Sequence, residues 1–233
     1  MLNLALKTDR DKLEQMIADD VEQFCKDYYE ADNRNHLGAS ELGEQCFRKL
    51  YYKFRWFKKP DPDGRMRRLF NVGHAAEPRF ITYLRGIGFE VKEFEKNILH
   101  YHPESDSYWY DKEFNQGDGL VEDVSNYEHH VIKAASLNIK PTQFRISGCK
   151  GHYGGSLDGM CKAPARYNLP EDLIILNEFK TNNTGKGYAA VAEQDLSKAK
   201  PKHYAQMCQY GEKYSLKYGL YMIENKNDSD ITF

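Results

Sequence analysis

Hydrophobic side chains recur every three or four residues near the start of the chain, a spacing typical of amphipathic helices. They predict a helix over about residues 9–32, with an apolar side formed by Leu13, Ile17, Val21, Phe24 and Tyr28. We expect this helix to pack its apolar side on the rest of the protein, as an N-terminal arm that takes up residues 1–36.

Two more helices are predicted before the first strand. One begins at Glu41 with Ser40 as its N-cap, and it directs three side chains toward the core, Leu50, Tyr51 and Trp56. The other follows the break at "KKPDPDGR" and has apolar positions from Val72 onward at helical spacing. Pro78 places the start of its regular part close by, and a strand over 89–91 follows.

The second half of the chain alternates strand and helix patterns. Residues 144–160 predict a pair of short strands, "DLIILNEF" a buried strand, residues 201–213 a helix and "YGLYMIENKND" a last strand. The segment 99–141 is aromatic, acidic and irregular, so we treat it as an insertion in a domain that spans 37–233. This order predicts an α/β fold around a central mixed sheet flanked by helices.

Composition excludes some classes of protein and leaves others open. The chain has 233 residues, of which 40% are hydrophobic and 29% charged, and its net charge of −2 fits a folded soluble protein. Near-neutral charge does not exclude nucleic acid, because a basic groove can coexist with an acidic site. We expect a cytoplasmic protein that does not bind membranes, since no apolar run reaches about 20 residues and the N-terminus is too charged for a signal peptide.

Charged residues stand at the ends of two predicted strands, in "GGSLDGM" and "NEFKT". If these strands are neighbours, Asp158, Glu178 and Lys180 converge at one edge of the sheet. Glu178 and Lys180 then share a face and Phe179 points into the core. Carboxylates beside a backbone carbonyl suit Mg²⁺ or Mn²⁺. The alternative is an Asp-Gly hairpin turn with a surface Glu and Lys pair.

These residues, as an ordered set, resemble the PD-(D/E)XK nuclease superfamily in its RecB-type, lambda-type exonuclease and CRISPR-associated branches. The set comprises Asp158 with "EFK", Glu77 in "VGHAAEP", Gln206 and Tyr210 in "HYAQMCQY", and the approach segment "GASELGEQCFRKLYY". The resemblance covers about residues 37–228 and implies a restriction-endonuclease-like core.

The resemblance implies a metal-dependent DNA nuclease, and specifically an exonuclease that acts at DNA ends in recombination, replication or repair. It also implies a bacterium or a phage-infected cell as the setting. Asp158, Glu178 and the Phe179 carbonyl would hold Mg²⁺ or Mn²⁺, as two ions per site, with Glu77 as a further ligand and His74 ranked below it. Lys180 would orient the attacking water. We expect five residues to contact DNA, namely Gln206, Tyr210, Arg48, Ser40 and Thr181.

Cysteines limit the cofactors that the resemblance implies. Relatives often hold an iron-sulfur cluster with one cysteine near Cys46 and three after the Gln-x-x-x-Tyr helix, but no cysteine follows Tyr210 here. We therefore expect no cluster and five reduced thiols. The resemblance also allows a homo-oligomer and a recombination or single-strand-annealing partner.

Basic residues are interleaved with aromatic ones in "RKLYYKFRW", and this segment could form a wall for single-stranded ends. Arg65, Arg67 and Arg68 add a second basic cluster. The alternative is a solvated basic face with its aromatic side chains in the core. For the whole protein, the alternative function is a catalytically weak DNA-binding module of the same fold. A Mg²⁺ enzyme acting on small phosphates is disfavoured, because no GxxxxGK[ST] loop is present.

Overall fold

A five-stranded mixed sheet forms the centre of the computed structural model, which describes residues 7–29, 36–55, 61–96, 98–110, 122–183 and 187–233. In spatial order the strands are β13 (Ile231–Thr232), β12 (Tyr218–Asn225), β11 (Ile175–Asn182), β10 (Met160–Lys162) and β2 (Glu90–Lys92). β11 and β12 are parallel, whereas β10 runs antiparallel to both β11 and β2. The predicted α/β class with a mixed sheet is therefore confirmed.

β11 and β12 are the two long central strands, and each has eight residues. β11 is buried from Ile175 to Phe179, as expected of a strand covered on both faces. The parallel register places Glu178 beside Tyr221 and Lys180 beside Ile223. Side-chain alternation along β11 therefore decides which residues face which layer of helices.

Helix α3 (Gly64–Gly86) covers one face of the sheet and helix α7 (Pro201–Tyr214) the other. On the α3 side, Phe80 stacks on Phe179 with ring centroids 5.2 Å apart. On the α7 side, Met207 and Tyr210 pack with Leu176. Two short helices, α5 (Ala189–Glu193) and α6 (Leu196–Ala199), lead from β11 into α7.

α3 begins earlier than its sequence pattern predicts. Asp63 caps the helix through its Oδ1 atom, which accepts a hydrogen bond of 2.7 Å from the Met66 amide. The helix then continues through Pro78 to Gly86. Expecting a start near Pro78 was wrong, because Pro78 removes only one helical donor and the apolar contacts of Ala76 and Phe80 hold the helix on both sides of it.

The predicted helix at Glu41 is wrong in its start and in its buried side. Ala39–Glu41 form a 3-10 turn, η1, capped by Gly38, and Ser40 is exposed there. The helix that follows, α2 (Phe47–Phe54), has Cys46 as its N-cap and no buried residue. Tyr51 is 58% exposed rather than in the core. Trp56 lies outside the described residues.

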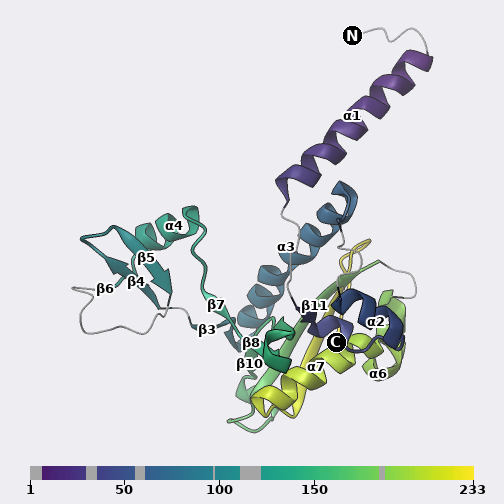
Figure 1. The fold of residues 1–233 in the computed structure, drawn as a ribbon. Helices are drawn as coiled ribbons and strands as arrows, with labels where there is room; N and C mark the ends of the chain where they lie inside the picture. Colours follow the sequence, from purple (N-terminus) through teal and green to yellow (C-terminus); the bar gives the residue numbers. More distant parts are fainter. Residues whose placement is uncertain (1–6, 30–35, 56–60, 97, 111–121, 184–186) are drawn as a thin grey trace.

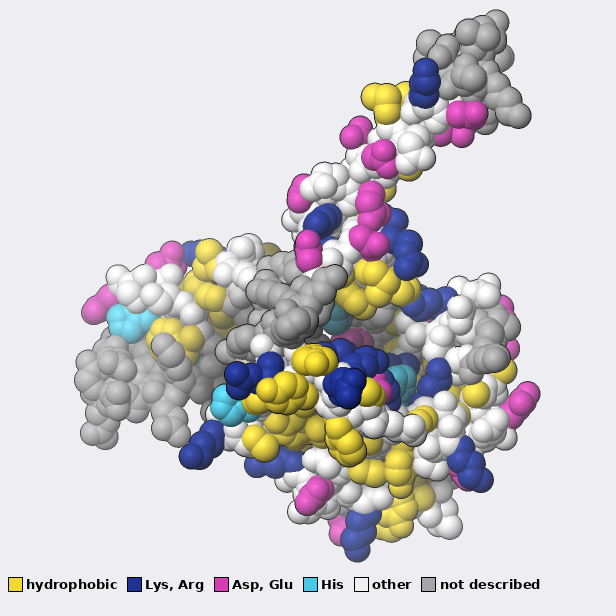
Figure 2. Space-filling view, turned by 45° about the vertical axis from the view of Figure 1, so that its right-hand side comes forward, with side chains coloured by type: hydrophobic (Ala, Val, Ile, Leu, Met, Phe, Trp, Pro, Cys, Tyr) yellow, Lys and Arg dark blue, Asp and Glu magenta, His cyan; other side chains and the backbone are white. Residues whose placement is uncertain are grey.

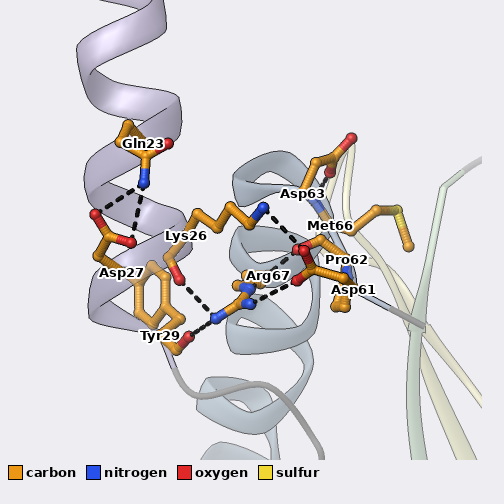
Figure 3. A network of polar contacts seen from close by, with 9 residues as sticks. All are labelled: Gln23, Lys26, Asp27, Tyr29, Asp61, Pro62, Asp63, Met66 and Arg67. Atoms are coloured by element: carbon orange, nitrogen blue, oxygen red, sulfur yellow. Dashed lines mark hydrogen bonds and ion pairs between the residues drawn. The ribbon is translucent and has the colours of Figure 1, made fainter. Parts of the chain in front are cut away.

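The N-terminal arm is present as α1 (Lys7–Tyr28), but it projects from the body (Figure 1). Its five predicted apolar positions are 41–67% exposed, so the expectation that they pack on the body was wrong. The last turns of α1 rest on the start of α3, where Cys25 is buried and Arg67 contacts the α1 backbone (Figure 3).

Three smaller sheets complete the fold in the described residues. In the first, β9 (Tyr153–Ser156) lies between β1 (Leu37–Gly38) and β8 (Arg145–Gly148), so the predicted hairpin of β8 and β9 is confirmed. The turn η2 (Cys149–Gly151) joins that hairpin, and a second turn, η3 (Ala165–Tyr167), follows β10. The hairpin of β8 and β9 lies beside the α7 face, because Phe144 and Ile146 belong to its core cluster. η3 lies instead near the end of α3, where Tyr167 contacts Phe89.

The segment expected to be irregular forms a small lobe with a core of its own. Its sheet places β4 (Leu99–His102) between β5 (Ser107–Tyr110) and β6 (Glu122–Asp123), and α4 (Glu128–Ser136) covers it. The core comprises Leu99, Tyr108, Val124 and Ala134. A two-stranded neck of β3 (Phe94–Lys96) and β7 (Thr142–Gln143) connects the lobe to the body (Figure 1).

Candidate functional site

The structure brings Asp158, Glu178 and Lys180 together at the end of β11. Lys180 Nζ lies 2.5 Å from Glu178 Oε1 and 3.8 Å from Asp158 Oδ2. The same ammonium donates a hydrogen bond of 3.0 Å to the Phe179 carbonyl. All four groups that the sequence indicates therefore converge, and the alternative of a surface Glu and Lys pair does not hold, because Glu178 is fully buried.

Asp158 occupies the turn between β9 and β10, not a strand, and reaches β11 through its side chain. Asp158 Oδ2 accepts a hydrogen bond of 2.7 Å from the Phe179 amide, so this carboxylate is fixed against β11. Gly159 follows with φ of 131°, and a Cβ there would lie 2.9 Å from the Lys92 carbonyl. Only glycine fits this position without strain, which explains the Asp-Gly pair.

The burial of three charges shapes the electrostatics of the site. Burial raises the pKa of Glu178 to about 7, although the Lys180 ammonium opposes the rise. Burial also raises the pKa of Asp158 above its ordinary value, again against the effect of Lys180. Burial alone would lower the pKa of Lys180, but the Glu178 and Asp158 carboxylates outweigh it and raise that pKa.

Glu77 and His74 lie on α3, close enough to the site for their charges to affect the pKa of its carboxylates. Glu77 raises the pKa of both Asp158 and Glu178, after the larger effects of burial and of Lys180. His74 Nδ1 lies 3.5 Å from Glu77 Oε1, and the His74 side chain is 77% exposed. The structure thus places both predicted ligands of α3, Glu77 and His74, beside the site, and Glu77 is the less exposed of the two.

The carboxylate and carbonyl oxygens of the site are of the kind that binds a divalent cation. Among the described residues, Glu178 Oε1 has only the ion pair with Lys180, and Glu178 Oε2 has no hydrogen-bond partner. A fully buried carboxylate oxygen without a donor favours a bound cation. Oxygen donors from two carboxylates and a carbonyl suit Mg²⁺ or Mn²⁺. As the described side chains stand, no three of His, Cys, Asp or Glu gather closely enough to hold a metal ion, and Lys180 lies beside both carboxylates.

Gln206 and Tyr210 form a buried pair beneath the site. Gln206 Nε2 donates a hydrogen bond of 3.0 Å to the Tyr210 hydroxyl, one helical turn away. Both side chains are buried, so neither lies at the protein surface. Gly155 allows this arrangement, because a Cβ there would lie 2.7 Å from the Tyr210 hydroxyl and 2.6 Å from Ala39 Cβ.

Two further residues belong to the neighbourhood of the site and were not anticipated. His203 Nδ1 lies 2.7 Å from the Tyr221 hydroxyl, and Tyr221 pairs with Glu178 across the parallel strands. Burial lowers the pKa of His203 to about 4, with help from the Lys180 and Lys200 charges. The spacing of His203, three residues before Gln206 on one helix, was the signal that could have identified it.

The remaining predicted DNA contacts lie at three different places. Thr181 follows Lys180 on β11 and alternates to the α3 face, where it is half-buried. Arg48 is exposed on α2, and Ser40 is exposed in η1. The segment of η1 and α2 is joined to α7 by Glu44, which forms ion pairs of 2.6 Å with both Lys49 of α2 and Lys202 of α7.

Comparisons with known proteins add no relative. No family model, no curated protein and no solved structure matches this chain. Among the described helices, none combines the length and the apolar character that a membrane span requires. The class of the chain therefore rests on its α/β fold and on the buried acidic and lysine cluster of β11.

Proposed function

We propose that this chain is a metal-dependent DNA nuclease, an exonuclease that hydrolyses phosphodiester bonds at DNA ends. The observation that carries the proposal is the fully buried Glu178 carboxylate, which lies with Lys180 and Asp158 at the end of a central strand. Buried charges of this kind are costly to folding and are concentrated at functional sites. A purely structural strand end has no need of them.

The proposal extends to a restriction-endonuclease-like core within the α/β fold. Its support is the placement of each motif that resembles the PD-(D/E)XK superfamily. Glu77 lies on the helix over one face of the sheet, and Gln206 and Tyr210 lie on the helix over the other. Asp158, Glu178 and Lys180 lie between them at the strand ends.

Each residue then has a distinct role in hydrolysis. Asp158, Glu178 and the Phe179 carbonyl would hold Mg²⁺ or Mn²⁺, and Glu77 would add a carboxylate. The ions would polarise the phosphodiester and lower the pKa of a water molecule. Lys180, through Nζ, would orient the attacking water. The buried pair of Gln206 and Tyr210 would brace this face of the site rather than contact DNA directly.

Cleavage of end-labelled linear DNA and closed circular DNA, with Mg²⁺, Mn²⁺ or EDTA, tests the proposal. We expect Glu178→Ala and Lys180→Ala each to reduce cleavage by on the order of 100-fold or more. Glu193→Ala and Lys198→Ala, at exposed positions of α5 and α6, are matched controls that should cleave like the wild type.

The outcomes separate the site, the reaction and the alternative function. Wild-type rates in both β11 variants would contradict the site assignment. Degradation of linear but not circular DNA supports an exonuclease, and nicking of circles would replace it with an endonuclease. DNA binding without cleavage under every metal condition would favour the catalytically weak binding module.

A further inference from the structure

The arm formed by α1 exposes an apolar side that nothing in the described part of the chain covers. Leu13, Ile17, Val21, Phe24 and Tyr28 recur along one side of the helix, and Phe24 stacks on Tyr28. A helix with 22 residues is about 33 Å long, and most of α1 lies beyond the body (Figures 1 and 2). Isolated helices are marginal in water, so such a helix gains most from a partner.

Charge distinguishes this arm from an ordinary apolar surface. α1 has seven acidic and four basic residues, and Asp19, Asp20, Glu22 and Asp27 lie in its second half, against the single Lys26. Asp20 and Asp27 have the helical spacing that places them beside Ile17 and Phe24, whereas Glu22 pairs with Arg68 of α3. The apolar side is therefore bordered by negative charge near the body. A partner surface that fits it must be apolar and basic.

α2 presents a surface of that complementary kind. Phe47 and Tyr51 are one turn apart on one side of the helix and are 84% and 58% exposed. Around them the chain places five basic side chains, Arg48, Lys49, Lys53, Arg55 and Lys202. Lys49 and Lys202 pair with Glu44 and Lys53 pairs with Glu41, so the surface keeps a net positive charge. In Figure 2, hydrophobic and basic side chains gather side by side on the body below the arm.

We propose that the α1 arm of one copy of this protein docks on the α2 surface of a second copy. The apolar side of α1 would cover Phe47 and Tyr51, and its acidic border would face the basic side chains around them. A two-fold pair repeats this contact, because each copy supplies one arm and one α2 surface.

The anchoring of α1 excludes docking on α2 of the same copy. Arg67 donates hydrogen bonds to the carbonyls of Lys26 and Tyr29, and Glu22 pairs with Arg68. At Gly64 the backbones are so close that a Cβ would lie 2.1 Å from the Glu22 carbonyl oxygen. These contacts, of which Figure 3 draws those of Arg67, fix the arm in the direction away from the body that Figure 1 shows. Its apolar side is therefore available to another molecule.

Molecular mass in solution tests this docking. Full-length protein freed of nucleic acid is measured by sedimentation over a concentration series, beside two double variants. Ile17→Asp with Phe24→Asp alters the arm, and Phe47→Asp with Tyr51→Asp alters α2. All four side chains are exposed, so folding should persist, which circular dichroism checks. Ile132→Asp, at an exposed apolar position of α4, is the control.

We expect the wild type and the control to associate, and each double variant to do so at least roughly 100-fold more weakly. A mixture of the two variants should associate again, because one contact of the pair keeps an intact arm and an intact α2. A monomeric wild type, or a mixture that stays monomeric, would overturn the proposal. An α2 variant that associates normally would overturn it too. In that case, loss of single-stranded oligonucleotide binding would assign α2 to nucleic acid.

Discussion

Arg67 is the residue on which the position of the N-terminal arm depends most. Its Nη1 donates hydrogen bonds of 2.5 Å to the Lys26 carbonyl and 2.6 Å to the Tyr29 carbonyl (Figure 3). Its Nε donates to the Pro62 carbonyl at 3.0 Å, and its Nη2 pairs with Asp61 at 3.2 Å. The carbonyls at the end of a helix have no helical donor, so a guanidinium there acts as a cap.

These contacts determine how much the removal of Arg67 should weaken the docking of α1. A hydrogen bond to a charged group contributes about 1.5–3 kcal/mol, and Arg67 makes two of them to the end of α1. Exposed ion pairs such as Lys26 with Asp61 contribute less than about 1 kcal/mol. We therefore expect Arg67→Ala to weaken the docking of α1 by about 3 kcal/mol, or roughly 100-fold in its equilibrium constant.

Hydrogen exchange measured by mass spectrometry reports this loss by segment. In Arg67→Ala, peptides from the second half of α1 should exchange faster, while peptides from β11 keep their wild-type rates. Arg67→Lys should lie between the two, because an ammonium cannot form the same fork of donors. Arg145→Ala, at an exposed arginine of β8, is the control. Unchanged exchange of α1 in Arg67→Ala would refute the reasoning.

Three more predictions concern the body. Lys180→Met should lower the free energy of unfolding by about 3–5 kcal/mol, because it leaves the buried Glu178 charge unpaired; urea denaturation should show the double variant with Glu178→Gln to be less destabilised, and simple additivity would contradict this. Gly155→Ala should cost about 1–3 kcal/mol by overpacking, while Gly73→Ala, in open space on α3, should stabilise by up to about 1 kcal/mol; equal urea midpoints would contradict both. The pKa of His203 is depressed from 6.5 to about 4, so the folded state favours neutral His203. Below pH 6.5 the unfolded state gains a proton that folded His203 does not gain until about pH 4, so the free energy of unfolding falls by up to about 3 kcal/mol over this range. It should fall more steeply with acid in the wild type than in His203→Gln, and parallel pH profiles would contradict this.

The centre of the sheet and the site were predictable because their signals are local. A run of apolar residues up to Leu176 indicates a buried strand, and alternation after it places Glu178 and Lys180 on one face. The helix that carries Gln206 and Tyr210 shows its period directly in the sequence. For Asp158 the glycine after it indicates a turn. Its approach to β11 depended on the two strands being neighbours, which the pairing of β10 with β11 confirms.

The errors occur where the outcome depends on distant parts of the chain. A 3.6-residue period shows which side of α1 is apolar, but it cannot show that Arg67 holds the helix away from the body. The hydrophobicity of Tyr51 predicts a core residue. However, the polar side of α2 is held to α7 by the ion pairs of Glu44 with Lys49 and Lys202, and Tyr51 stays exposed. The segment 99–141 was expected as an insertion, but its strands were not predicted, because they have two to four residues, too few for a period to appear.

The neck of β3 and β7 makes the lobe a separable module. Phe94 pairs with Gln143 and Lys96 with Thr142, so the two ends of the segment 97–141 meet at one ladder. A segment whose ends meet can be gained or lost in evolution without a change of path in the rest of the chain. An engineer could close the same ladder with a two-residue Asn-Gly turn and obtain a shorter protein that keeps both α3 and β11.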